Sequence, residues 1–184
     1  MSTRPARVHT YDSLKDVQAA AAAYDANNEG FVVRFASGFR IKIKGSEYLR
    51  IHRLISRVTP VALWEIMNEG GSLDAMRREI PEEFWGDFDA IRGLLEKGIA
   101  AVVDEVEAAK RQWADKSDKE LGLQLSTLPP LVRTLLFSAR KEGERWFEVP
   151  RVRATLLRHL RPTSNVLPGY TPSELLGRVQ DEAG

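Results

Sequence analysis

The sequence predicts an α+β fold that is mostly helical, with one β-hairpin near the N-terminus. Two segments, 31–35 and 39–44, show the alternation with a period of two that is typical of half-buried strands. After Lys44 the chain carries helix caps, helical spacing and prolines at helix starts, and no later segment alternates as clearly. Hydrophobic residues make up 43% of the chain, which is enough for a buried core and is not the composition of a disordered protein.

The residues before the hairpin predict a short strand followed by a helix. Segment 8–11 is strand-like, and Ser13 is a suitable helix N-cap with Asp16 three residues later. An alanine tract continues the helical pattern. We expect this helix to end near Tyr24, because the next four residues, Asp25 to Asn28, are typical of a loop.

The hairpin itself has a tight connection and two chemically different faces. The three residues between the strands, Ala36-Ser37-Gly38, suit a short turn because glycine accepts a positive φ in the last place. The second strand divides its side chains between two faces, with Phe39, Ile41 and Ile43 on one and Arg40, Lys42 and Lys44 on the other. We expect the apolar face to pack on a core and the other to present cations spaced by roughly 7 Å.

Helices are expected over the rest of the chain. Ser46 predicts an N-cap, with Glu47 favoured by the helix dipole in the first turn. Thr59-Pro60 predicts a cap followed by proline at the first helical position, and Ser117 opens a capping box. Further helices are expected within 84–113, from 130 to 141 and from 150 to 160.

Composition and motifs exclude several classes of function. The absence of cysteine excludes disulfides, thiolate nucleophiles and zinc–thiolate sites. The sequence contains no HExxH, GxxxxGK, GxGxxG or GxSxG motif. We expect a cytoplasmic protein without a membrane partner, because the N-terminal residues resemble no signal peptide and no apolar run is long enough to span a bilayer.

A net charge of +1 conceals three blocks of charge. Residues 34–57 contain seven bases and one acid, residues 65–107 contain twelve acids and four bases, and residues 133–161 contain eight bases and three acids. Basic blocks attract polyanions such as RNA. Solvated helix faces explain the C-terminal block equally well.

The hairpin and its flanks carry the candidate chemistry. Glu29 lies at the start of the first strand, and Lys42 and Lys44 share one face of the second. A carboxylate is a hard oxygen ligand for Mg²⁺ or Mn²⁺, and two lysines on one face can hold a phosphate. Gly30 lets the backbone approach a ligand closely. The alternation alone favours a plainer alternative, an amphipathic hairpin whose lysines only keep a strand edge soluble.

The same residues resemble motifs of a known enzyme superfamily. Glu29-Gly30-Phe31-Val32-Val33 resembles motif IV of the covalent nucleotidyltransferases, and Lys42-Ile43-Lys44 resembles motif V. Residues 47–54 are similar to the helix after motif V in RNA ligases of the T-even-phage type, and residues 59–65 resemble the helix opening that follows. The resemblance implies an ATP-dependent RNA ligase. Residues 1–58 would then be the C-terminal part of the antiparallel adenylyltransferase domain, and residues 59–184 a helical domain.

The resemblance also implies roles for individual residues. In that family a lysine within a KxDG motif attacks ATP and carries AMP, which passes to an RNA 5′-phosphate before a 3′-hydroxyl seals the strand. By matching positions, Glu29 would help to bind Mg²⁺ or Mn²⁺, and Lys42 and Lys44 would act in catalysis by contacting the nucleotide phosphate beside Gly30. The expected partner is RNA with such ends, and its backbone would be contacted by four arginines, Arg34, Arg40, Arg50 and Arg53.

One departure from the family limits this hypothesis. The sequence contains no KxDG, and Lys116-Ser117-Asp118-Lys119 lacks the glycine and follows motif V instead of preceding it. The 28 residues before Glu29 are too few for the missing motifs. We therefore expect a partial chain that cannot adenylylate itself and needs an upstream fragment or subunit to supply KxDG. The alternatives are a non-catalytic module that binds RNA or a partner, and an inactive truncated ligase.

Overall fold

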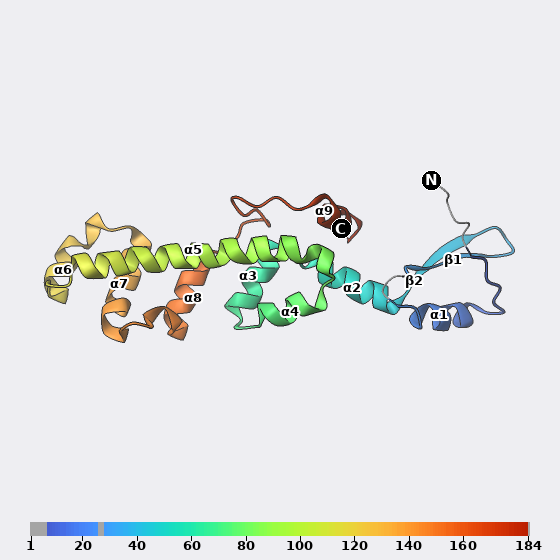
Figure 1. Cartoon of the computed structure of the whole chain (residues 1–184), viewed down its shortest axis with the longest axis horizontal. Helices are drawn as coiled ribbons and strands as arrows, with labels where there is room; N and C mark the ends of the chain where they lie inside the picture. The colour runs from blue at the N-terminus through green and yellow to red at the C-terminus, as the bar shows by residue number, and fades with distance from the viewer. Residues whose placement is uncertain (1–6, 26–27, 184) are drawn as a thin grey trace.

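The fold is α+β and mostly helical, as the sequence predicts. The structure is a computed structural model that describes residues 7–25 and 28–183. Figure 1 shows an elongated molecule in which the long helix α5 (Trp85–Gln112) is the spine, and the hairpin with α1 (Leu14–Ala22) lies at one end. In the described part of the chain, none of the helices is both long enough and apolar enough to cross a lipid bilayer.

The remaining elements are joined mostly by short connections, with a longer one over residues 160–173. In chain order they are β1 (Gly30–Arg34), β2 (Arg40–Lys44), α2 (Ser46–Ser56), α3 (Pro60–Asn68), α4 (Leu73–Glu79), η1 (Glu82–Phe84), α6 (Asp118–Gln124), η2 (Leu125–Thr127), α7 (Pro130–Glu142), η3 (Trp146–Glu148), α8 (Pro150–His159) and α9 (Glu174–Ala183), with α5 between η1 and α6.

The predicted hairpin is present within one residue at each end. β1 and β2 are antiparallel, and their register pairs Phe31 with Ile43 and Val33 with Ile41. The tip closes with two backbone hydrogen bonds, from Phe35 N to Phe39 O and from Gly38 N to Phe35 O, both 2.9 Å. Gly38 has φ 85°, the left-handed conformation that the sequence assigned to it.

The predicted strand at 8–11 is wrong. These residues have no strand partner among the described residues, and the structure gives them no regular secondary structure. Their rings instead lie against the hairpin, with the centroids of His9 and Tyr11 at 5.9 and 5.7 Å from that of Phe31. The segment therefore helps to cover the apolar face of the hairpin without adding a strand to it.

Most predicted helix caps form. Ser13 accepts a hydrogen bond from Asp16 N, Thr59 accepts one from Ala62 N, and Ser117 makes its capping box. The predicted cap at Ser46 is wrong, because Gly45 occupies the N-cap position of α2. The hydroxyl of Ser46 donates instead to Ala22 O, at 3.2 Å, where the last turn of α1 leaves carbonyls without helical partners.

Two hydrophobic clusters lie along α5. The first contains Phe88, Ile91 and Leu95 of α5 with residues from α2, α3, α8 and α9, and the second contains Val102 and Val106 with residues from α6, α7, η3 and α8. Each cluster encloses a tryptophan whose indole nitrogen has a partner. Trp64 Nε1 donates to Leu157 O and Trp146 Nε1 donates to Glu107 Oε1, both at 2.7 Å.

The segment that leads into α9 is fastened to the start of α5 by a buried carboxylate. Asp87, in the first turn of α5, is only 7% exposed. It accepts hydrogen bonds from the Tyr170 hydroxyl and from both the backbone N–H and the hydroxyl of Ser173, at 2.6–2.9 Å. From there α9 packs on α2, and Gln180 donates to Val58 O. The C-terminal helix therefore braces the helix that carries the hairpin.

Candidate functional site

The candidate site lies on the open face of the hairpin. Residues directly opposite one another share a face, so the pairs Gly30–Lys44, Val32–Lys42 and Arg34–Arg40 lie together on one side. The other side, with Phe31, Val33, Ile41 and Ile43, is half-buried against α1 and the residues around it. Val32 on the open side is 70% exposed, so no described segment covers this face.

Glu29 and Lys42 form an ion pair at the base of this face. The Lys42 Nζ atom lies 2.5 Å from Glu29 Oε1, and about half of each side chain is exposed. The backbone carbonyl of Glu29 accepts a hydrogen bond from Gly45 N at 2.9 Å, which continues the strand pairing past Gly30. The structure thus brings together the two residues that the motif spacing assigned to one site.

Lys44 and a tyrosine complete the cluster. Lys44 Nζ lies 5.4 Å from the ring centroid of Tyr48, in the first turn of α2, which is within range of a cation–π interaction. A hydrogen bond from the Tyr48 side chain also helps to lower the pKa of Glu29. Sequence reasoning missed Tyr48. The sequence did contain an indication of this contact, because Tyr48 comes four residues after Lys44, at the start of the helix that directly follows β2.

The electrostatics of the cluster keep Glu29 charged. The pKa of Glu29 lies below its ordinary value, chiefly because Lys42 donates a hydrogen bond to the carboxylate, and partial burial opposes this shift. The positive charges of Lys42 and Lys44 lower the pKa further. A carboxylate that stays ionised holds Lys42 in place while the remaining positive charge faces solvent.

Replacing Lys42 with methionine is expected to raise the pKa of Glu29, because the change removes the largest cause of the lowering. The folded-state pKa lies below the unfolded one, so the pair stabilises the fold above the unfolded pKa and loses that effect as pH falls through the folded value. NMR titration of the Glu29 side-chain carboxyl carbon measures the shift. Lys97→Met, on the exposed surface of α5, is the control, and an equal pKa in the Lys42 variant and the wild type would contradict the pairing.

Gly30 has a structural role that sequence analysis did not assign to it. Its φ is 137°, a conformation that residues with a side chain rarely adopt. A Cβ at this position would overlap the carbonyl oxygen of Ile43 and lie 2.9 Å from Lys44 Cα. The glycine therefore lets β1 start close against β2, which sets Glu29 beside Lys42.

The donor set of the cluster fits a phosphate better than a metal ion. Two ammonium groups and a tyrosine ring surround a single carboxylate, and that carboxylate is already paired with Lys42. Nowhere in the described part of the chain do three His, Asp or Glu side chains gather as metal ligands would. Glu29 alone is not a magnesium site, so we derive no chemical step through a metal from these residues.

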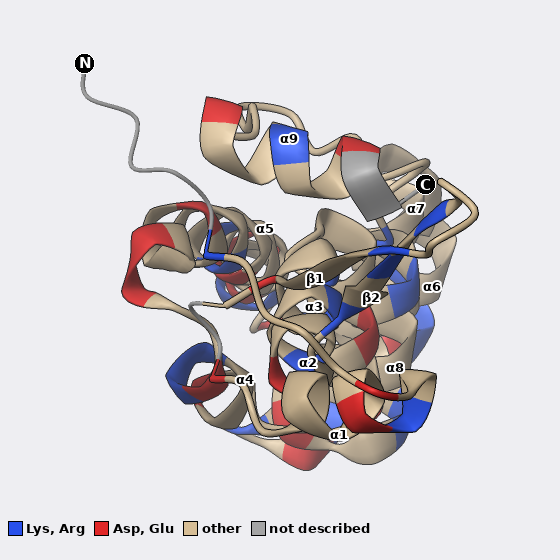
Figure 2. Ribbon diagram, turned by 90° about the vertical axis from the view of Figure 1, so that its right-hand side faces the viewer, with Lys and Arg blue, Asp and Glu red and all other residues tan. Residues whose placement is uncertain are grey.

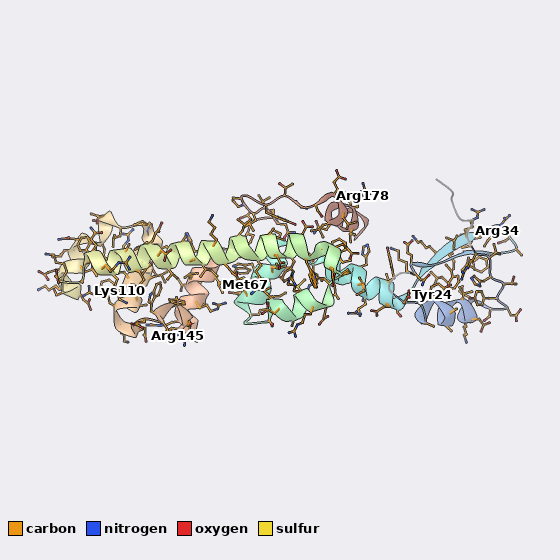
Figure 3. All side chains as sticks on the ribbon, in the orientation of Figure 1. Tyr24, Arg34, Met67, Lys110, Arg145 and Arg178 are labelled. Atoms are coloured by element: carbon orange, nitrogen blue, oxygen red, sulfur yellow. The ribbon has the colours of Figure 1, made fainter. Side chains whose placement is uncertain are left out.

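The four arginines predicted to contact nucleic acid fall into different settings. Arg34 and Arg40 face each other across the strands at the outer end of the hairpin, and Figure 3 shows Arg34 far from the helical body. Arg50 is held by Glu47 at 2.8 Å and lies 3.8 Å from Glu79, so its charge is already matched. Arg53 is exposed in the last turn of α2. The structure therefore places two of the four on the candidate face.

Comparison with known proteins identifies no relative of this chain. No protein-family model, no curated protein and no solved structure matches the chain.

Proposed function

We propose that this chain is the phosphate-binding C-terminal portion of an ATP-dependent RNA ligase that depends on another segment or subunit for its nucleophilic lysine. The observation that carries the proposal is the cluster of Glu29, Lys42 and Lys44 on the open face of the hairpin. These are the residues that the motif resemblance assigns to the nucleotide site.

The charges of the cluster support phosphate binding. Its three ionised groups leave one net positive charge, and a phosphate can compete with Glu29 for Lys42 because both are anions that accept hydrogen bonds from an ammonium group. Lys44 lies on the same face beside it. Fixed cations of this kind stabilise the charge that moves between oxygens during phosphoryl transfer.

The free edges of the hairpin support dependence on another segment. Among the described residues β1 and β2 pair only with each other, so each strand has one unpaired edge. Such an edge is a template for additional strands. A segment that supplies KxDG can extend the sheet there and face Lys42 and Lys44 across a completed site.

AMP transfer tests this function. We expect no covalent AMP on this chain alone when it is incubated with labelled ATP and magnesium, because the chain has no KxDG lysine. Adding the KxDG-containing N-terminal segment of a phage-type RNA ligase is expected to produce transfer of AMP to 5′-phosphorylated RNA. Lys42→Ala with Lys44→Ala is expected to reduce that transfer by about 100-fold or more.

Lys97→Ala with Lys119→Ala is the matched control, since it removes the same charge from exposed positions on α5 and α6. Covalent AMP on the chain alone would contradict the dependence on a second segment. Failure of the added segment to produce any transfer, with both partners folded, would contradict the ligase function.

A non-catalytic RNA-binding module is the second candidate. The observation that favours it is the uncovered cationic face, which can hold RNA without any chemistry. Salt-dependent binding of RNA without AMP transfer under any of the conditions above would select this candidate. Absence of RNA binding at low salt would eliminate it.

A further inference from the structure

The outer end of the hairpin holds an unusual pair of like charges. Arg34 and Arg40 are direct cross-strand partners on the open face, and neither makes an ion pair with an acid in the part of the chain that the structure describes. Like charges directly opposite each other destabilise a strand pair. Figure 2 shows basic residues on the hairpin, where β2 carries three and β1 carries only Arg34.

Some arginines elsewhere in the described part of the chain are matched with acids. Arg77 binds Asp89 through two hydrogen bonds of 2.7 Å, and Arg92 contacts both Asp74 and Glu96. The hairpin tip differs from these sites, because its two arginines lie directly opposite each other across the strands. An anion that binds between Arg34 and Arg40 would relieve the repulsion between them.

We infer that Arg34 and Arg40 form an anion clamp for a backbone phosphate of single-stranded RNA, one step along the strand from the phosphate at Lys42 and Lys44. The inference rests on the proposed function, because that function makes RNA the substrate. The clamp adds a second point of contact with RNA to the proposed function. It also implies that the RNA backbone runs along β2 from the base of the hairpin to its tip.

The geometry of a strand pair suits this arrangement. Directly opposite residues have Cβ atoms about 4.5–5.5 Å apart, so two guanidinium groups can grip one phosphate from both sides. Alternate residues of a strand are roughly 7 Å apart, which gives a row of cations at Arg40, Lys42 and Lys44. Val32, exposed between the Arg34 end and the base, offers an apolar contact for a sugar or base.

The distribution of charge favours the tip over the base. Glu29 offsets one of the two lysines at the base, whereas the described residues place no acid beside the two arginines at the tip. A polyanion is therefore attracted more strongly per cation at the clamp than at the ion-paired cluster.

Salt-dependent binding of a labelled oligouridylate tests the clamp. The probe has about 12 nucleotides, within the range that single-strand binding sites cover. Arg34→Ala with Arg40→Ala is expected to lower the magnitude of the slope of log K against log salt by about 0.7, which is one phosphate contact on a single strand. Lys97→Ala with Lys119→Ala removes the same net charge and is expected to leave the slope unchanged.

A second variant distinguishes a loss of RNA binding from a loss of folding. Arg34→Glu places opposite charges across the strands, so it is expected to raise the melting temperature while it weakens RNA binding. An unchanged slope in the double alanine variant, or an equal loss in the lysine control, would overturn the clamp. Competition by oligoglutamate as effective as that by unlabelled RNA would overturn the assignment of RNA as the ligand.

Different experimental results would overturn the clamp and the proposed function. Normal slopes in the arginine variants, together with AMP transfer that depends on Lys42 and Lys44, would overturn only the clamp. A reduced slope in the arginine variants, without AMP transfer after the KxDG segment is added, would support the clamp and overturn only the ligase function.

Discussion

Gly30→Ala is expected to destabilise the hairpin by about 3 kcal/mol or more, the cost of a strained backbone conformation combined with a steric clash. The φ of 137° at Gly30 is unfavourable for alanine, and the new Cβ would overlap the carbonyl oxygen of Ile43. That carbonyl belongs to β2, where Ile43 pairs with Phe31, so it cannot move away without disturbing the strand pairing.

Hydrogen exchange measured residue by residue checks this result. The hairpin contributes no residue to either hydrophobic cluster, so we expect its amides to lose protection while those of α5 keep theirs. Gly93→Ala is the control, because Gly93 lies exposed within α5 with open space around its Cβ position, and the change is expected to stabilise by about 1 kcal/mol. Unaltered protection of the hairpin in the Gly30 variant would refute the steric argument.

Asp87→Ala is expected to lower the free energy of unfolding by about 3 kcal/mol, since it leaves partly buried donors without their acceptor. The lost partners are the Tyr170 hydroxyl and the backbone N–H and hydroxyl of Ser173. The change also removes a negative charge from the first turn of α5, where the helix dipole favours it.

Denaturant unfolding measures the loss, and limited proteolysis locates it. We expect faster cleavage in the connection between α8 and α9, because Asp87 fastens that segment to α5. Asp89→Ala is the matched control, since its ion pair with Arg77 is partly exposed and is expected to contribute less than about 1 kcal/mol. Equal destabilisation by the two substitutions would show that burial of Asp87 has no special effect.

The sequence predicted those features of the fold that depend on neighbouring residues. The alternation in 39–44, the glycine of the turn and the caps at Ser13 and Thr59 all describe interactions within a few residues, and the structure contains them. The strand predicted at 8–11 failed because a strand requires a partner, and partner availability is not a local property. The predicted N-cap at Ser46 was wrong for a related reason, since the Ser46 hydroxyl donates a hydrogen bond to a carbonyl 24 residues away in the sequence.

The candidate site shows the same limit. Motif spacing placed Glu29 and Lys42 together, and the ion pair confirms their proximity, although their catalytic roles stay predictions. The Arg50–Glu47 pair, three residues apart, was within reach of sequence reasoning and would have removed Arg50 from the predicted RNA contacts. Asp87 was out of reach, because its partners lie 83 and 86 residues away and no pattern in the sequence connects them.

The way α8 and α9 complete the first hydrophobic cluster has a consequence for synthesis on the ribosome. That cluster begins with Ile55 and Leu63 but also requires Leu157 and Leu176, which are almost fully buried within it. A chain that emerges from its N-terminus therefore makes α3, α4 and most of α5 long before their covering helices exist. The apolar surface of these early helices therefore stays exposed until α8 and α9 have been translated, a state that favours aggregation or chaperone binding.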